Sequence, residues 1–158
     1  LKRVLGIARS CDHYIWEQLM GEVERRPRWL RPGTSMMVVR NVSCTATPED
    51  LMKLWPPQGS WHYLYLPYDS KRERFMGYAF MKFNDHESAL KFADHWHGHH
   101  LPNRARRSLS VSVASIQSVR DSLACVEWEQ LLWLTGIGMG PVLFVHGLRV
   151  DVKLAYLC

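Results

Sequence analysis

Residues 76–83, with the sequence MGYAFMKF, carry the side chains best suited to binding a flat ligand. Side chains alternate between the two faces of a strand, so Tyr78, Phe80 and Lys82 point one way and the intervening Ala, Met and Phe point the other. Aromatic rings on a solvated sheet surface suit unpaired bases, each stacked base contributing about 1–3 kcal/mol. The segment therefore predicts a strand whose outer face binds single-stranded RNA.

Further side chains are expected to share or border this face. In the strand expected over residues 35–42, Val38 and Arg40 face the same way as the two rings. We expect Arg40 and Lys82 to neutralise phosphates, and the polar loop before the strand supplies cations that can follow the RNA backbone. Those loop residues are Lys71, Arg72 and Arg74, for which plain solvation is the alternative.

The elements that must position these residues follow one another in the order β-α-β-β-α-β. Thr47 and Pro48 are typical of a helix start, and Gly98 ends a second helix that begins after Asn84. Alternating apolar residues predict the remaining strands at 61–66 and 109–113. The fold class predicted for residues 34–117 is therefore α+β and ferredoxin-like, a four-stranded antiparallel sheet backed by two helices.

Three segments lie outside this domain. Residues 1–33 combine a helical apolar spacing with a basic end, which indicates an N-terminal basic helix or linker. Residues 118–134 continue a helical period and predict an extra C-terminal helix. Residues 135–158 show no clear period and are interpreted as a poorly specified tail.

Composition sets the class of partner. The chain has 158 residues, a net charge of +5 and a pI of about 9.2, which permits a polyanionic partner without demanding one. Its four cysteines form no CxxC pair, as expected of reduced intracellular thiols. The uncharged run at 131–145 is short and broken by glycines, so no membrane span is expected.

No pattern in the sequence predicts catalysis, a cofactor or a metal. His95 and His99 are spaced i, i+4, but Gly98 is expected to end the helix between them, and no Cys or carboxylate completes a site. The glycine run at 136–140 lacks the strand and the lysine of a phosphate-binding loop. The chain is therefore not expected to be an enzyme.

Residues 76–83 and the element order together resemble an RNA recognition motif. Four short segments resemble, more narrowly, the C-terminal motif of the Mei-two-like proteins, which are nuclear regulators of meiosis and development. The four segments are residues 39–42 (VRNV), 63–69 (YLYLPYD), 77–80 (GYAF) and 114–117 (ASIQ). The resemblance implies post-transcriptional regulation through RNA, with the nucleus favoured over the cytoplasm. Met76 and Val38 differ from the residues usual in the general motif, but both fit the Mei-two-like group. Residues 43–45 (SCT) do not fit the Mei-two-like group.

The alternative is a protein-interaction module with the same fold. In that case a helix spanning about 116–134 covers Tyr78 and Phe80, or the two rings dock a partner helix. Trp128 and Trp133 provide the C-terminal helix with enough apolar surface to do so. Binding of RNA weakens with salt, whereas an apolar interface is almost independent of salt, so a salt titration separates the two.

Overall fold

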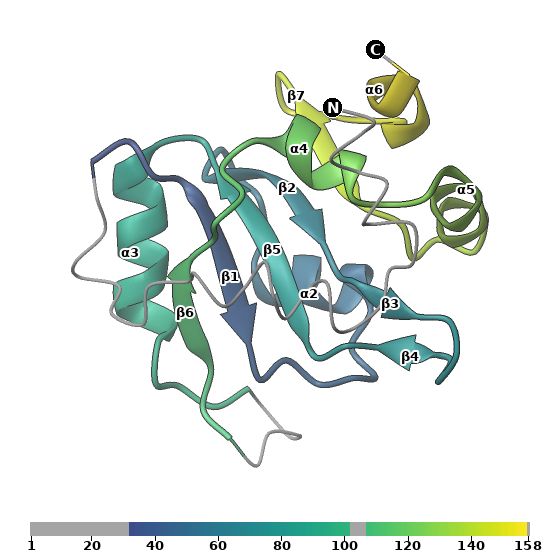
Figure 1. Cartoon of the computed structure of the whole chain (residues 1–158). Helices are drawn as coiled ribbons and strands as arrows, with labels where there is room; N and C mark the ends of the chain where they lie inside the picture. Colours follow the sequence, from purple (N-terminus) through teal and green to yellow (C-terminus); the bar gives the residue numbers. More distant parts are fainter. Residues whose placement is uncertain (1–31, 102–106, 158) are drawn as a thin grey trace.

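The computed structural model describes residues 32–101 and 107–157, and the helix expected near the N-terminus lies outside them. A six-stranded antiparallel sheet runs through the molecule in the order β6-β1-β5-β2-β7-β8 (Figure 1). Its strands are β1 (Met36–Arg40), β2 (Trp61–Tyr65), β5 (Tyr78–Phe83), β6 (Ser110–Val113), β7 (Val142–Val145) and β8 (Leu148–Val150). The first four make the predicted ferredoxin-like sheet, which is confirmed, and the last two extend it.

Two helices back one face of the sheet, as predicted. Helix α2 (Pro48–Leu54) begins with a capping box, in which the Thr47 side chain accepts from the Asp50 N–H and the Asp50 carboxylate accepts from the Thr47 N–H. Helix α3 (His86–Trp96) is capped by the Asp85 side chain. These helices cover one core cluster, to which the inward residues of β1 and β5 contribute Met37, Val39, Ala79, Met81 and Phe83.

The segment after β6 forms two helices where the sequence predicted one. Helix α4 (Val119–Ala124) is capped by Ser118, and helix α5 (Trp128–Gly136) starts after a break at residues 125–127. At the break, the N–H groups of Cys125 and Val126 donate to carbonyls only three residues earlier, which ends the first helix. No Gly or Pro marks this position, so the apolar spacing looked continuous.

Residues 135–158 are not the poorly specified tail that the sequence suggested. The glycine run closes α5 in a Schellman motif, with the Met139 N–H donating to Leu134 and the Gly138 N–H to Thr135 while Gly138 has φ of 75°. The chain then forms β7, β8 and α6 (Val152–Leu157). A two-residue turn with positive φ at His146 and Gly147 joins β7 to β8, as a tight hairpin requires.

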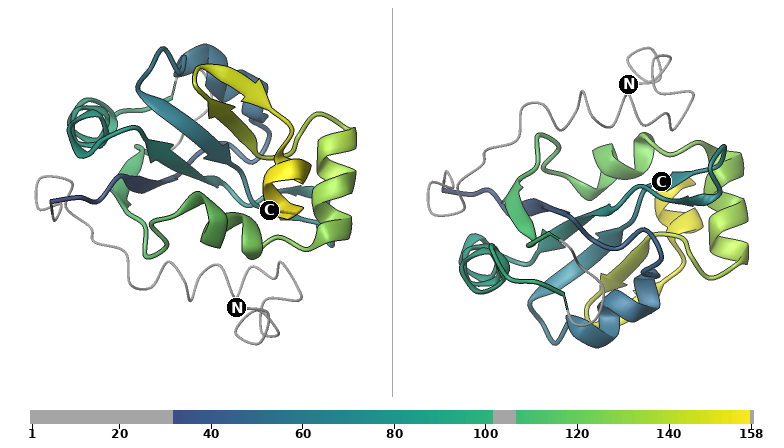
Figure 2. Two further views of the ribbon diagram at one scale, coloured as in Figure 1. Left: turned by 90° about the horizontal axis from the view of Figure 1, so that it is seen from above. Right: turned by 90° about the horizontal axis from the view of Figure 1, so that it is seen from below.

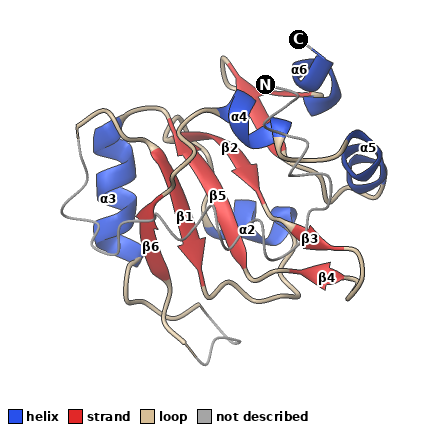
Figure 3. Ribbon diagram, in the orientation of Figure 1, coloured by secondary structure: helices blue, strands red, loops and turns tan. Residues whose placement is uncertain are grey.

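Helices α4 and α6 lie on the face of the sheet opposite α2 and α3, whereas the β7–β8 hairpin extends the sheet itself. Figure 2 shows α4 on one side of the sheet and α2 and α3 on the other. A small separate hairpin, β3 (Tyr68–Asp69) paired with β4 (Arg74–Phe75), sits beside α5 (Figure 3). The sheet is therefore a middle layer with both faces buried. Among the described residues, no helix combines the length and apolar character needed to cross a membrane.

Candidate nucleic-acid interface

The predicted stacking residues lie together on adjacent strands. In the register of β1 and β5, Val38 is opposite Phe80 and Arg40 is opposite Tyr78. The rings of Tyr78 and Phe80 meet edge to face, with centroids 5.9 Å apart and planes at 86°. The sequence therefore placed these side chains on the correct face of the sheet, and their role in RNA binding stays a prediction.

Gly77 has a specific structural reason to precede Tyr78. It adopts φ of 87°, and a Cβ there would lie 3.2 Å from the Val42 carbonyl oxygen. The Gly77 carbonyl accepts a 2.9 Å hydrogen bond from the Val42 N–H, which ties the start of β5 to the chain after β1. The glycine therefore permits the close approach that aligns the two central strands.

The same face carries two aromatic residues that the sequence analysis did not assign to it. Tyr65 pairs with Phe80 and Tyr63 pairs with Lys82 in the register of β2 and β5. Both tyrosines are fully buried. The alternation of β2 was the available signal, because Tyr63 and Tyr65 have the spacing of residues that share one face. Four aromatic side chains thus gather on this surface.

The expectation of an open sheet face is wrong for this structure. Tyr78 is 5% exposed and Phe80 3% exposed, and Val38 is fully buried. These residues belong to a second core cluster that is completed by residues of the C-terminal segment; the latter are Leu123, Val126, Leu131, Leu143 and Val152. We refer to residues 118–157 as the cap. The cap covers the rings because flat apolar surface gains free energy by packing against apolar side chains as well as against bases.

A buried hydrogen bond joins the cap to the sheet. The hydroxyl of Tyr63 lies 2.8 Å from the hydroxyl of Ser122 on α4, and both side chains are buried. Burial raises the pKa of Tyr63 far above its usual value, and the hydrogen bond with Ser122 offsets part of this effect. Each hydroxyl is a buried polar group that needs its partner, so the pair fixes how α4 sits on β2.

The cap is anchored at its root by Gln117. Its side-chain oxygen accepts from the N–H groups of Ser35 and Met36, both at 3.0 Å, and its NH₂ donates to the carbonyls of Met36 and Ala114. The Gln117 amide therefore uses its full hydrogen-bonding capacity to link the start of β1 to the residue that follows β6.

Lys82 is partly exposed and is hydrogen-bonded to Gln117, the residue just before the cap. Its ammonium donates a 2.7 Å hydrogen bond to the Gln117 carbonyl, and partial burial lowers its pKa below the usual value. The predicted phosphate contact of Lys82 thus competes with an existing bond to the protein.

The basic loop stands apart from the aromatic face. Lys71, Arg72 and Arg74 are exposed and belong to the β3–β4 hairpin, which does not pair with the six-stranded sheet. Asp69 organises the loop by accepting from the N–H groups of Lys71 and Arg72. The Arg72 guanidinium lies 3.7 Å from the same carboxylate. The loop is therefore shaped independently of the stacking residues, and Arg40 is the one predicted cation on β1.

The histidine cluster has a structural arrangement of its own. The exposed rings of His95 and His99 stack with centroids 5.6 Å apart, and His97 Nδ1 accepts a 3.0 Å hydrogen bond from the Val111 N–H. Over residues 32–101 and 107–157, no group of three or more metal-binding side chains comes together. The two stacked rings therefore lack further ligands within the described part of the chain.

Comparison with known proteins gives one family and a set of solved domains. The family model for the RNA recognition motif matches residues 37–107. No curated protein matches the chain. The chain is 31% identical to the N-terminal RNA-binding domain of a hypothetical protein, covering 57% of this chain and 88% of that one, with a TM-score of 0.47.

Two further solved structures cover a similar share of this chain at lower sequence identity. The structure of the Rna15 domain with bound RNA (GU) is 23% identical to this chain, and the match covers 55% of this chain and 89% of the Rna15 chain, with a TM-score of 0.46. The second such domain of yeast poly(U)-binding protein (Pub1) is 20% identical, with 54% and 100% covered and a TM-score of 0.45. In each case more than two fifths of this chain lies outside the matched region.

Proposed function

The chain contains an RNA recognition motif at residues 37–107, and from this premise we propose that it binds single-stranded RNA without catalysis. One observation carries the proposal: the family match coincides with a central strand, β5, on which Tyr78 and Phe80 stand side by side. Rings in this arrangement suit the stacking of unpaired bases, which is worth about 1–3 kcal/mol for each base.

Binding at this face requires the cap to move away. The rings are buried under α4, α5 and α6, so the free protein is competent for stacking only in the fraction of time when the cap is open. The apparent dissociation constant then equals the intrinsic one divided by that fraction. A closed cap therefore weakens RNA binding without removing it, and the proposed contacts of Val38, Arg40 and Lys82 depend on the same opening.

A protein-interaction module is the second candidate, and the covered face supports it. In this alternative the cap is a permanent layer, and RNA never reaches Tyr78 or Phe80. The domain would then act through its outer surface, on which Trp133 is 49% exposed and Leu132 is 41% exposed. Such an interface buries apolar area and is nearly independent of salt.

The narrower likeness to the Mei-two-like proteins supports a more specific role for the proposed RNA binding. It depends on residues 39–42, 63–69, 77–80 and 114–117, and the last of these contains Gln117, which anchors the cap. On this likeness, we propose a nuclear protein that regulates transcripts of meiosis or development. The RNA-binding test does not depend on this finer assignment.

The decisive experiment combines a looser cap with an altered stacking surface. Val126→Ala/Leu131→Ala removes cap side chains from the second cluster, and Phe80→Leu keeps apolar volume while removing a ring. Fluorescence anisotropy with a pool of short single-stranded RNAs should show tighter binding when the cap is loosened. Phe80→Leu in the loosened protein should then weaken binding at least about fivefold, the equivalent of about 1 kcal/mol of stacking.

Controls separate the two candidates. Leu132→Ala truncates an exposed leucine on the same helix as Leu131 and should leave RNA binding unchanged. Binding should weaken with salt, with a slope near 0.7 for each neutralised phosphate on a single strand. Unchanged affinity in the loosened protein and in its Phe80→Leu variant would exclude stacking on this face. No binding by any variant would favour the protein-interaction module.

A further inference from the structure

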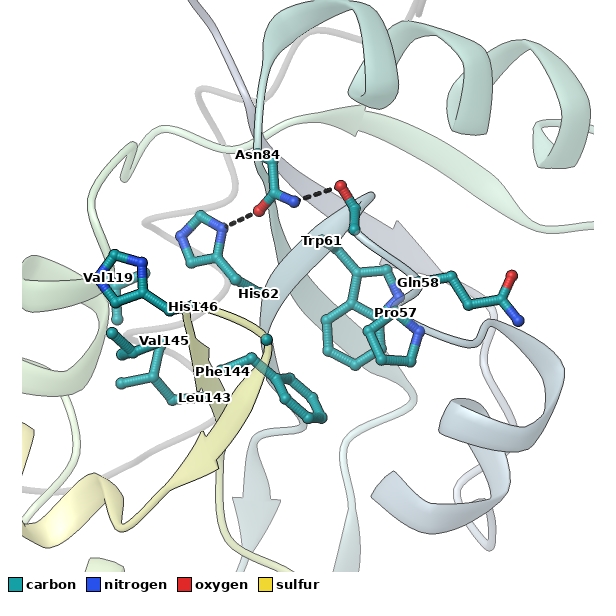
Figure 4. Close-up of a pocket in the computed structure, with 12 residues that line it drawn as sticks. Pro57, Gln58, Trp61, His62, Asn84, Val119, Leu143, Phe144, Val145 and His146 are labelled. Atoms are coloured by element: carbon teal, nitrogen blue, oxygen red, sulfur yellow. Dashed lines mark hydrogen bonds between the residues drawn. The ribbon is translucent and has the colours of Figure 1, made fainter.

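A hollow of about 780 Å³ opens at the end of the sheet, away from the covered rings (Figure 4). It lies between the loop after α2, the first residues of β2 and the β7–β8 turn. The hairpin that forms one wall belongs to the cap and pairs with β2 through Tyr63 and Leu64. The hollow therefore exists only because the C-terminal segment extends the sheet.

His62 is held in a fixed orientation at this hollow. The pairing of β2 with β5 shifts register between Trp61 and Tyr63, so His62 is an extra residue at a β-bulge, a feature that redirects a side chain. Its Nδ1 lies 2.6 Å from Asn84 Oδ1, and the Asn84 NH₂ donates to the Gly59 carbonyl (Figure 4). The Asn84 oxygen is thereby directed at His62, so Nδ1 carries the proton in the neutral ring and Nε2 is left as an acceptor.

Two further polar side chains at the hollow, Gln58 and His146, belong to residues with positive φ. Gln58 has φ of 34° and His146 has φ of 50°, both in the left-handed region that favours glycine. The tight β7–β8 turn accounts for the φ of His146, whereas a positive φ at a non-glycine residue such as Gln58 costs free energy, and such residues concentrate at binding sites. Four polar side chains from separate segments of the chain, Gln58, His62, Asn84 and His146, thus border one hollow.

The walls of the hollow indicate an uncharged, flat ligand. Phe144 and Trp61 meet edge to face with ring centroids 5.8 Å apart, and Leu143 and Pro57 add apolar surface. Among the described residues that line the hollow there is no Lys, Arg, Asp or Glu. A nucleobase is neutral and flat, has an apolar face, and carries donors and acceptors along its edge that amide and imidazole groups can bind.

We propose that this hollow binds one unpaired nucleobase, with Gln58, His62 and His146 contacting the edge of the base and Phe144 contacting its ring. The inference rests on the proposed RNA binding and adds a base site that stays accessible while the cap covers Tyr78 and Phe80. The phosphates of a bound strand remain outside the hollow, which explains why its lining needs no cation.

The test uses the full chain and four ribonucleosides, adenosine, guanosine, cytidine and uridine, in ¹H–¹⁵N NMR titrations. At least one nucleoside should shift the amide signals of Gly59, Asn84 and Gly147. Gln58→Gly/His146→Gly should raise its dissociation constant at least tenfold. Glycine suits the positive φ at both positions, so this variant keeps the backbone turns and removes only the side chains.

Glu73→Gly is the matched control, because Glu73 also has positive φ, 53°, but lies in the β3–β4 loop outside the hollow. It should leave the nucleoside titration unchanged. No shifts at the hollow with any nucleoside, or an unchanged dissociation constant in the double glycine variant, overturns the inference. Shifts there with N-acetyl-tyrosinamide but not with nucleosides also overturn it, in favour of a peptide.

A short RNA pool separates this inference from the proposed function. If the pool binds but the signals at the hollow do not move, the base site is wrong and RNA binding stands. If a nucleoside occupies the hollow but the pool does not bind, the base site stands for a free nucleoside and the RNA function is wrong.

Discussion

The two faces of the central sheet are both buried, but different kinds of structure cover them. On one face, α2 and α3 pack on the side chains of Met37, Ala79 and Met81, and side-chain caps define both helix starts. On the other face lie the short helices of the cap, of six, nine and six residues, while the hairpin of the cap extends the sheet at its edge. Short helices have little stability of their own, so the cap depends on tertiary packing more than α3 does.

The difference between the two faces shows that an aromatic strand face is compatible with either base stacking or core packing. Tyr78, Phe80 and Tyr65 have the flat apolar surface that stacks on bases, and the same surface packs against Leu131 and Val126. Neither strand alternation nor charge distinguishes these uses. The cap, which follows the RNA recognition motif in the chain, decides whether the rings stack on bases or pack in a core. Mutations can measure how far the cap unfolds separately from the rest of the domain.

The largest effect is expected on the face covered by α2 and α3. Phe83 is 1% exposed, and its ring lies 5.0 Å from that of Phe92 on α3. Phe83→Ala should lower the free energy of unfolding by about 3–5 kcal/mol, because a large cavity opens in the main core. Urea denaturation measures the loss, and a change below about 1 kcal/mol would contradict the proposed core.

A smaller and local effect is expected on the cap. Leu131→Ala removes a fully buried side chain and should cost about 2–5 kcal/mol in cap stability. Hydrogen exchange should speed up in α4, α5 and α6 while β1 and β5 keep their protection. The neighbouring Leu132→Ala, at a side chain 41% exposed, is the control and should change little. Uniformly faster exchange would mean that the cap and the domain open as one unit.

The hydrogen bond between Tyr63 and Ser122 should contribute less. Tyr63→Phe or Ser122→Ala alone leaves one buried hydroxyl without its partner and should cost about 1–3 kcal/mol. The double variant should cost less than the sum of the two, with a coupling of about 1 kcal/mol in a double-mutant cycle. Additive losses would show that the two hydroxyls do not stabilise each other.

The smallest effect is a pH dependence at Lys82. Partial burial lowers the pKa of Lys82, so above that pKa the unfolded chain binds more protons than the folded one. Stability should therefore rise with pH from the lowered pKa up to about 10.4, the value in an unfolded chain. The rise should be absent in Lys82→Met, as measured by urea denaturation from pH 7 to 11. Equal pH profiles for the two proteins would contradict the assignment.

Local signals made much of the domain predictable. Thr47 and Asp50 define the start of α2 through hydrogen bonds three residues apart, and Asp85 does the same for α3. The alternation of residues 76–83 placed Phe80 and Phe83 on opposite faces, which the two core clusters confirm. These features depend on residues close in sequence, and they therefore leave a pattern.

The cap and the hollow left weaker patterns. The β7–β8 hairpin turns on His146 and Gly147, which lack the Asn-Gly or Asp-Gly signature of such turns. Gln58 and His62 look like ordinary loop and strand residues until a register shift and a hairpin more than eighty residues away in the chain bring His146 beside them. Contacts of this kind depend on pairing between distant strands and cannot be found from spacing.

The sequence by itself determined which side chains share each face of the sheet, because strand alternation and helix caps are local. The sequence left both an open and a covered aromatic face possible, and only tertiary structure decided between them, since the outcome depends on whether Tyr78 and Phe80 are more stable against the cap than in water. Apolar burial has no direction and no sequence signature beyond the presence of apolar residues. The same rings are therefore a binding surface or a core according to what lies over them.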